Sequence, residues 1–411
     1  MTSIGGTLAE EGDRVTQLLE DELGGMMFAP STNSITFFSG PVSIDSVRSR
    51  VGLMVESNPW LLSNLVKLNS DDEVVAKYCL KPGLSELDCF TVLDNPCLSS
   101  TLPYDQLLKE VSDVLVPIGV SCVDKREPLW RVTLYVIKPE LEYALVVSLS
   151  HVMGDGHTFY TLYSMLSCDA PIRTLEFDRH HAFGDQLIQC VGKPLQDWIY
   201  SPYFGQGIAN TLQRAAPSVC AYTINKTEIQ RLKGEVIEGF VSTNDILVSW
   251  FCRLCQTDYG LMVVNFRNRV EGLTNEHIGN YHKILVYSPD QYQQAVKIRQ
   301  SLPSFNKGGQ LPTQEQTLEF NVAMVTNWSA YYRDIQLCSS GVSTSTSDKI
   351  QQLAHIPLLK AGNINFRDCC VIFQSDRHTL AVMLFTRSAV DIPALVAAEH
   401  PSVKLLDKKL I

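Results

Sequence analysis

The sequence predicts an α/β protein built from two lobes, each a mixed β-sheet packed with helices. The chain has 411 residues, of which 45% are hydrophobic and 19% are charged. This length exceeds one ordinary core, and the composition supplies enough apolar residues for two. Both halves mix strand-like and helical patterns in similar proportion. We therefore expect an N-terminal lobe over residues 1–185, a crossover over 186–217 and a C-terminal lobe over 218–411.

The first elements of the N-terminal lobe follow from β-branched runs and capping residues. We expect a short strand over Ser34 to Ser39, followed by a helix that is capped by Ser43 or Asp45. Apolar runs over 129–137 and 143–149, separated by a short Lys-Pro-Glu turn, predict a hairpin. We expect the second strand of this hairpin to lie in the centre of its sheet.

The helices and strands of the C-terminal lobe come after a segment in which the hydrophobic periodicity is lost. Residues from about 171 to 217 lose clear periodicity and carry several glycines and prolines, which is typical of a connecting segment. The run Ser242-Thr243-Asn244-Asp245 then predicts a helix start. Further strands are expected over 259–266, 321–328, 369–373 and 381–385, the last two as a hairpin.

The clearest chemical signal is His151, which closes the second strand of the predicted N-terminal hairpin and is followed by Gly154-Asp155-Gly156. The helical spacing of apolar residues from Phe159 to Leu166 predicts that a helix begins after this turn, near His157. The strand fixes the backbone, while the glycines permit a sharp turn and leave space near the imidazole ring. Histidine transfers protons well because its ordinary pKa lies close to working pH. The same pattern also fits a structural histidine beside a common Asp-Gly turn.

Charge and composition exclude several classes of partner. The net charge of −10 argues against nucleic acid and against an anionic membrane surface. No apolar stretch reaches the length that spans a bilayer. The polar, acidic start of the chain, Met1 to Asp13, resembles neither a secretory signal nor a transit peptide. We therefore expect a cytoplasmic protein.

The twelve cysteines show no disulfide framework, because their spacings are scattered. Cys252 and Cys255 form a C-x-x-C pattern within a predicted helix, but no second pair of ligands accompanies them. We expect structural thiols in a reducing compartment and no metal site.

Several segments together resemble one superfamily. The stretch from His151 to Gly156 matches the HxxxDG motif of the CoA-dependent acyltransferases, and Pro128 to Leu134 is similar to the strand that pairs with the motif strand. This superfamily includes chloramphenicol acetyltransferase, carnitine acyltransferases, condensation domains of peptide synthetases and the BAHD acyltransferases.

Three further stretches resemble the BAHD branch. They are Ser242 to Leu247 (the STND-x-L helix start), Asn265 to Arg269 followed by Ile278-Gly279-Asn280 (DxRxR…GN), and Val325 to Trp328 (VTSW). They occur in the family's order, and the resemblance covers residues 128 to about 334. Two departures are evident. Asn265 replaces the usual aspartate, and Asp334 to Cys338 keeps only the aspartate of the DFGWG element.

The resemblance implies a fold of two chloramphenicol-acetyltransferase-like lobes with an active-site tunnel between them. It implies acyl-CoA as a co-substrate, with no bound cofactor. His151 would be the general base, and Gly156 would give the substrates room. Asp155 would form a structural salt bridge with Arg267 or, as second choice, Arg269.

The oxyanion of a tetrahedral intermediate requires a hydrogen-bond donor. The Thr326 hydroxyl and the Trp328 indole N–H are candidates, because they alternate with their neighbours along one predicted strand. A core tryptophan is the other interpretation of Trp328.

We therefore expect a monomeric enzyme that transfers an acyl group from acyl-CoA to the hydroxyl or amine of a small-molecule acceptor. Three alternatives remain open. One is an enzyme similar to wax-ester or diacylglycerol synthases that uses long-chain acyl-CoA, and another is a condensation-type domain with a carrier-bound donor. The third is a non-catalytic binding protein with the acyltransferase fold.

Overall fold

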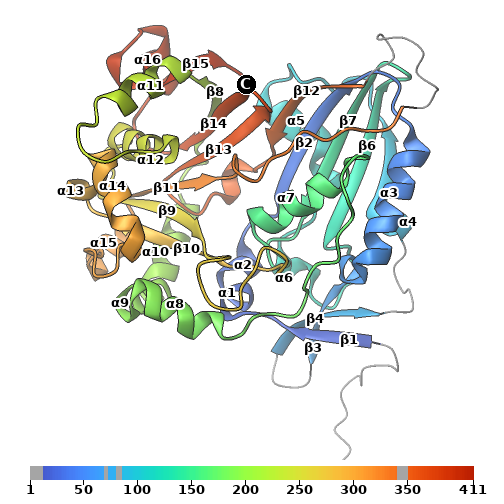
Figure 1. Cartoon of the computed structure of the whole chain (residues 1–411), viewed down its shortest axis with the longest axis horizontal. Helices are drawn as coiled ribbons and strands as arrows, with labels where there is room; N and C mark the ends of the chain where they lie inside the picture. Colours follow the sequence, from blue (N-terminus) through green and yellow to red (C-terminus); the bar gives the residue numbers. More distant parts are fainter. Residues whose placement is uncertain (1–12, 69–72, 80–85, 340–349) are drawn as a thin grey trace, which may run out of the picture. The chain divides into compact units, whose positions relative to one another are not determined.

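The computed structural model describes residues 13–68, 73–79, 86–339 and 350–411 (Figure 1). These residues form two compact units. Unit 1 comprises residues 1–181, 273–280 and 331–359, and unit 2 comprises 182–272, 281–330 and 360–411. The expected lobe boundaries at 185 and 217 therefore differ from the observed division. Nearly all of the start that carries the targeting prediction, residues 1–12, lies outside the described residues.

The main sheet of unit 1 has five strands in the order β12-β2-β7-β6-β5. Their bounds are β2 Thr32–Ser39, β5 Phe90–Asp94, β6 Trp130–Lys138, β7 Glu142–Leu149 and β12 Gln351–Pro357. The antiparallel β6–β7 hairpin confirms the prediction, and β7 occupies the central position. The edge strand β12 pairs antiparallel with β2, which explains why residues 331–359 belong to unit 1.

A second sheet of unit 1 has the order β1-β4-β3, from β1 Asp13–Gln17, β3 Asn64–Leu68 and β4 Glu73–Cys79. The helices of this unit are α1 Glu20–Leu23, α2 Gly25–Phe28, α3 Ile44–Ser57, α4 Glu86–Cys89, α5 Tyr104–Val111, α6 Gly119–Cys122 and α7 Gly156–Met165, with 3-10 turns η1 Pro59–Leu62 and η2 Ser112–Val114. Of the two caps proposed for α3, Ser43 is the one observed, since its side chain accepts from the Ser46 N–H at 3.2 Å.

The sheet of unit 2 has seven strands in the order β10-β9-β11-β13-β14-β8-β15. The bounds are β8 Ser218–Ile224, β9 Tyr259–Asn265, β10 His282–Tyr287, β11 Val322–Asn327, β13 Asp368–Asp376, β14 Thr379–Thr386 and β15 Leu406–Lys409. The predicted strands and the final hairpin β13–β14 are confirmed. Strand β11 runs parallel to both of its neighbours.

The helices of unit 2 include three in the segment expected to be a crossover, α8 Phe183–Val191, α9 Lys193–Ile199 and α10 Pro202–Leu212. The other helices are α11 Lys226–Gly234, α12 Thr243–Leu254, α13 Pro289–Tyr292, α14 Ala295–Ser301, α15 Gln314–Glu319 and α16 Ile392–Ala397, with 3-10 turns η3 Leu302–Ser304, η5 Ala361–Asn363 and η6 Pro401–Val403. In α9 and α10 the prolines lie in the first turn, where proline is tolerated. These prolines make the helices hard to predict from the sequence.

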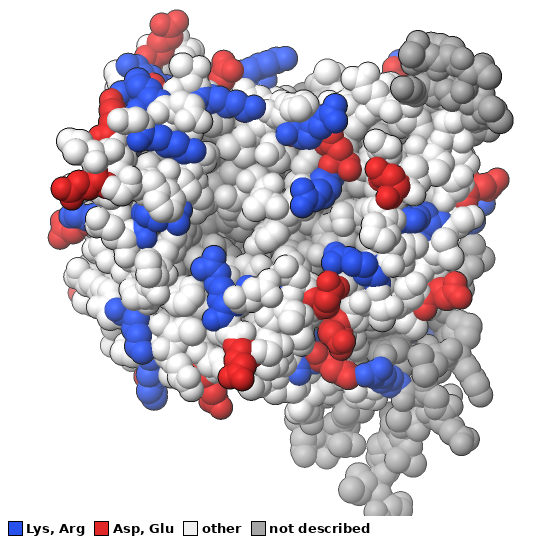
Figure 2. Space-filling view, viewed as in Figure 1, with Lys and Arg blue, Asp and Glu red and all other residues white. Residues whose placement is uncertain are grey.

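Within the described parts of the chain, no helix has the length and apolar character needed to cross a bilayer. On the face seen in Figure 2, basic and acidic side chains are interspersed.

Candidate active site

His151 follows directly after the central strand β7 and is half-buried. The backbone around it is fixed on both sides. The Ser150 N–H donates to the Leu129 carbonyl oxygen at 2.8 Å, and the Met153 N–H turns back to the Ser150 carbonyl oxygen at 3.0 Å. The predicted junction of strand, turn and helix is therefore present, with α7 beginning at Gly156.

Asp155 is the N-cap of α7. Its Oδ1 accepts from the Thr158 N–H at 3.0 Å and from the Thr158 hydroxyl at 3.2 Å. The residue is only 4% exposed, which rules out a solvent-exposed turn aspartate. Gly156 is the first residue of the helix and is half-buried. The carboxylate thus fixes the start of the helix that follows the histidine turn.

Asn280 holds His151 through both the ring and the backbone. Its Oδ1 lies 3.0 Å from His151 Nδ1, and its Nδ2 donates to the His151 carbonyl oxygen at 2.7 Å and to Glu22 Oε1 at 3.2 Å. Because both of these partners only accept, the amide nitrogen faces them and the amide oxygen faces the ring. His151 Nδ1 must then carry the proton, which leaves Nε2 as the basic nitrogen.

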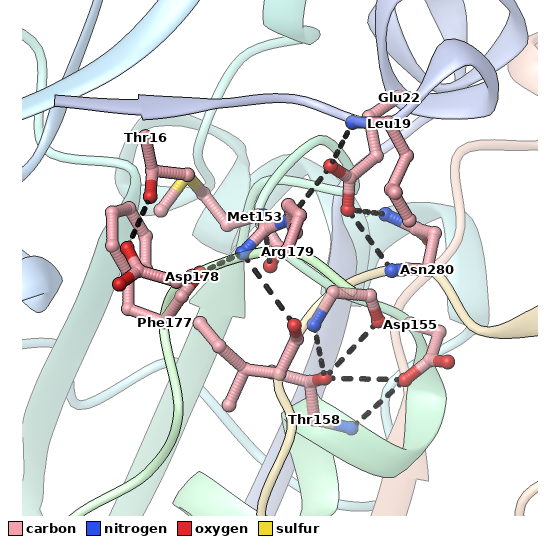
Figure 3. A network of polar contacts seen from close by, with 12 residues as sticks. Thr16, Leu19, Glu22, Met153, Asp155, Thr158, Phe177, Asp178, Arg179 and Asn280 are labelled. Atoms are coloured by element: carbon pink, nitrogen blue, oxygen red, sulfur yellow. Dashed lines mark hydrogen bonds and ion pairs between the residues drawn. The ribbon is translucent and has the colours of Figure 1, made fainter. Parts of the chain in front are cut away.

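Glu22 and Arg179 form a buried ion pair behind Asn280 (Figure 3). Arg179 Nε lies 2.8 Å from Glu22 Oε2, and both side chains are 0% exposed. Glu22 Oε1 also accepts from the Asn280 backbone N–H at 3.0 Å. Arg179 donates to the carbonyl oxygens of Phe177 at 2.8 Å and of Met153, in the histidine turn, at 3.3 Å. This network therefore orients the Asn280 amide and supports the turn.

Two glycines allow these segments to approach closely. Gly279 has φ +130°, and a Cβ there would lie 3.1 Å from both Arg179 Nε and Glu22 Oε1. A Cβ on Gly154 would lie 2.5 Å from the Thr158 side chain. The backbone also joins the segments, because the Asp155 N–H donates to the Gly279 carbonyl oxygen at 3.2 Å. Only glycine fits both positions without a shift.

The sequence alone assigned no role to Glu22, Arg179 or Asn280. Asn280 is part of the stretch that resembles the family's GN pair, so a signal for it existed. Glu22 and Arg179 lie on α1 and in an irregular segment before α8, and the sequence offers no local pattern that joins them. Burial of a charged pair becomes visible only in three dimensions.

The remaining predicted site residues lie in unit 2. Arg267 is 3% exposed and lies over the Tyr281 ring, with its guanidinium carbon 5.0 Å from the ring centroid. Arg269, in contrast, is exposed. Thr326 is half-buried in β11, and the buried Trp328 follows just after the end of that strand. His151, Asp155 and Gly156 belong to unit 1, so the joint roles of the two groups stay predictions.

Cys252 lies in α12 and Cys255 caps its C-terminal end, and both are buried. Burial raises the pKa of both thiols, which fits the structural role expected for them. The described part of the chain holds no group of three or more His, Cys, Asp or Glu side chains arranged to bind a metal ion.

No protein-family model matches the chain, and no curated protein matches it significantly. Solved structures do match. F. graminearum TRI101 in complex with coenzyme A and T-2 mycotoxin gives a TM-score of 0.61 at 13% identity, covering 97% of this chain and 100% of that chain.

Two condensation domains are also similar to the chain. The first condensation domain of the CDA synthetase gives a TM-score of 0.59 at 11% identity, over 97% of this chain and 99% of that chain. The starter condensation domain of the rhizomide synthetase RzmA, in complex with C8-CoA and Leu-SNAC, gives 0.55 at 12% identity, over 95% and 93%. The fold class predicted from the sequence is confirmed, and the chain has the fold shared by TRI101 and these condensation domains.

Proposed function

We propose that this protein is an acyltransferase that moves an acyl group from acyl-CoA to the hydroxyl or amine of a small-molecule acceptor, with His151 as the general base. One observation carries the proposal. Asn280 fixes the tautomer of His151 so that Nδ1 donates and Nε2 is basic. Coenzyme A in the TRI101 structure and C8-CoA in the RzmA structure support the choice of donor.

The proposed reaction needs a base but no metal ion. His151 Nε2 removes the proton of the acceptor hydroxyl as the acceptor oxygen attacks the thioester carbonyl carbon. The tetrahedral intermediate then collapses, the C–S bond breaks, and the departing thiolate takes the proton back from Nε2 to give free CoA. During this cycle the Nδ1–H bond to Asn280 and the nearby Glu22 carboxylate stabilise the transient imidazolium.

Asp155 acts in this proposal as a positioning residue, because its carboxylate caps α7. We keep Arg267 as its proposed ion-pair partner in preference to Arg269. A buried guanidinium requires an anionic or strongly polar environment, whereas an exposed one does not. Thr326 and Trp328 are the proposed donors to the oxyanion.

A condensation-type enzyme with a carrier-bound donor is the second candidate. The CDA synthetase domain matches the chain nearly as well as TRI101 does, so the fold alone favours neither donor. A long-chain donor and a non-catalytic binding protein are the remaining alternatives. Activity measured with acyl-CoA donors of different chain lengths separates them.

The proposal is tested by the release of free CoA thiol from a panel of short to long acyl-CoAs, with pooled alcohol and amine acceptors. Wild type, His151→Ala and the matched control His181→Ala, an exposed histidine, are compared. We expect acceptor-dependent release in wild type and in the control and its loss in His151→Ala. Equal release in all three proteins would exclude His151 as the base. Release only from a carrier-bound thioester would favour the condensation-type enzyme.

A further inference from the structure

The two most exposed large apolar side chains of the described residues lie three positions apart in unit 2. Ile237 is 98% exposed and Phe240 is 65% exposed. Both belong to residues 235–241, the loop that joins α11 to α12. Single exposed apolar residues are common on protein surfaces, but two of them on one short loop indicate a contact surface.

Phe240 is held in its exposed position by the protein itself. The guanidinium carbon of Arg299 lies 4.8 Å from the centroid of the Phe240 ring, and Arg299 Nε donates to Asp245 Oδ2 at 2.7 Å. Asp245 is 0% exposed, and its Oδ2 also accepts from the Ser242 backbone N–H at 2.7 Å. Because these contacts already fix the ring, little conformational entropy is lost when a binding partner covers it.

An open groove with a volume of about 570 Å³ lies beside this loop. Helix α12 packs against both α11 and α14 (Figure 1), and residues of all three helices and of the loop line the groove. Its apolar lining includes Val236, Val241, Ile246 and Val296, and Ile237 lines it as well. The exposed apolar side chains and an apolar groove therefore lie side by side on one face of unit 2.

The groove carries one acidic and one basic side chain that are not neutralised within the chain. Glu238 and Arg253 both line it, and both are exposed. Among the described residues neither forms an ion pair, and Arg253 Nε donates only to the Ser249 carbonyl oxygen, at 3.3 Å. Glu235 also lines the groove, but Arg231 neutralises it. The groove is therefore neutral overall and presents one charge of each sign.

We propose that this face binds a second copy of the same chain as a two-fold symmetric dimer. In such a dimer the same surface patch is used by both copies. Ile237 and Phe240 of each copy lie against the groove of the other. Glu238 of each copy pairs with Arg253 of the other. The proposal departs from the monomer that the sequence led us to expect, and it does not depend on acyl transfer.

The charges of the groove favour a second copy over other protein partners. The chain has a net charge of −10, so two copies repel each other and a contact between them requires a locally neutral patch. A strongly basic partner would leave Arg253 facing a like charge, and a strongly acidic one would do the same to Glu238. A two-fold axis leaves neither unpaired, because each copy supplies both signs.

The test measures the mass of the full-length protein by sedimentation equilibrium, from low to high micromolar concentration. We expect the wild type to pass from monomer to dimer. Ile237→Asp places a charge in the apolar contact and should raise the dimer Kd roughly 10- to 100-fold. Leu141→Asp, at a 62% exposed position in the β6–β7 turn, is the matched control and should leave the Kd unchanged. A wild type that stays monomeric, or a dimer that Ile237→Asp leaves intact, would overturn the proposal.

Charge reversal tests the two-fold pairing directly. Glu238→Arg alone and Arg253→Glu alone each place like charges opposite one another, so each variant should stay monomeric at concentrations at which the wild type dimerises. An equimolar mixture of the two variants should form a heterodimer, because one copy then carries two basic side chains at the pairing positions and the other carries two acidic ones. Circular dichroism checks that both variants are folded. A mixture that stays monomeric would exclude this pairing and with it the two-fold dimer.

Discussion

Asn280 Oδ1 lies 3.0 Å from His151 Nδ1, while the amide nitrogen of the same side chain donates to the His151 carbonyl oxygen at 2.7 Å. One amide thus holds both the ring and the backbone of the histidine. The carboxylate of Glu22 selects the orientation of that amide, because it accepts from Nδ2 and cannot donate. The position and the tautomer of the proposed base are therefore set by the same contact.

Replacing Asn280 should lower turnover without weakening substrate binding. In Asn280→Ala the ring loses the acceptor that fixes its tautomer, so we expect kcat to fall on the order of 10- to 100-fold. The KM for the acyl donor should stay near the wild-type value. Steady-state kinetics checks both constants, and Asn275→Ala, at an exposed position of the same segment, is the control. A parallel rise in KM would indicate a disrupted pocket instead of a misplaced base.

Breaking the buried ion pair should destabilise the fold. Glu22→Gln leaves the Arg179 guanidinium buried without its carboxylate, and we expect a loss of about 3–5 kcal/mol in the free energy of unfolding. The double variant Glu22→Gln with Arg179→Met removes the stranded charge and should recover part of that loss. Urea unfolding measures all three proteins. No recovery in the double variant would show that the packing of Arg179, not its charge, carries the stability.

Two substitutions should distinguish the contribution of Asp155 as a helix cap from the contribution of its negative charge. Asp155→Asn keeps an N-cap acceptor for the Thr158 N–H, so the free energy of unfolding should change little, whereas Asp155→Ala should lose about 1 kcal/mol. If the proposed ion pair with Arg267 exists, Asp155→Asn should still reduce kcat. The charge swap Asp155→Arg with Arg267→Asp should then recover activity relative to either single variant, measured by CoA release. Full activity of Asp155→Asn would remove the ion pair from the proposal.

Gly279 should not tolerate a side chain. Its φ of +130° and the 3.1 Å approach to Glu22 and Arg179 make Gly279→Ala strained, with an expected loss of about 1–3 kcal/mol. Gly52, in α3, has open space where a Cβ would lie, and alanine there should stabilise by roughly 0.5–1 kcal/mol. Thermal unfolding of the two variants should therefore shift in opposite directions.

His355 should make stability depend on pH. It is 0% exposed, bonded to the Thr36 hydroxyl at 2.9 Å and to the Tyr160 hydroxyl at 3.0 Å. Burial lowers the pKa of His355 to about 3. Below about pH 6.5, His355 is therefore protonated in the unfolded chain but stays neutral in the folded chain. Stability from this group is complete above about pH 6.5 and is lost as pH falls toward 3, by up to about 1.4 kcal/mol per pH unit.

Denaturant unfolding across this pH range checks that slope. His355→Gln removes the titrating group while keeping one donor and one acceptor, so its unfolding free energy should fall less steeply as the solution becomes acidic. An unchanged slope would mean that other groups govern the acid sensitivity.

The sequence predicted those features that depend on neighbouring residues. The β6–β7 hairpin, the starts of α3 and α12 and the helix after the His151 turn all follow from local patterns. The same local patterns missed α8, α9 and α10, because glycines and prolines in the segment resembled a linker. Proline at the first turn of a helix is compatible with helix formation, and the pattern alone does not distinguish the two cases.

The candidate site was predicted only in part for a different reason. His151 and Asp155 lie in one motif, so the sequence already placed them side by side at the end of a strand. Glu22, Arg179 and Asn280 come from three distant segments, and only the folded chain brings them together. Long-range contacts of this kind carry no period or spacing in the sequence.

The edge position of β12 has a consequence for synthesis on the ribosome. Strand β2 and its partner β12 are separated by most of the chain, so the first sheet gains its last strand only after nearly all of the protein has emerged. Until then, one side of β2 exposes unpaired backbone groups, which are prone to pair with other chains. Fragments that stop near residue 181 should therefore aggregate when expressed alone, and the nascent chain would benefit from chaperones until residue 357 has been translated.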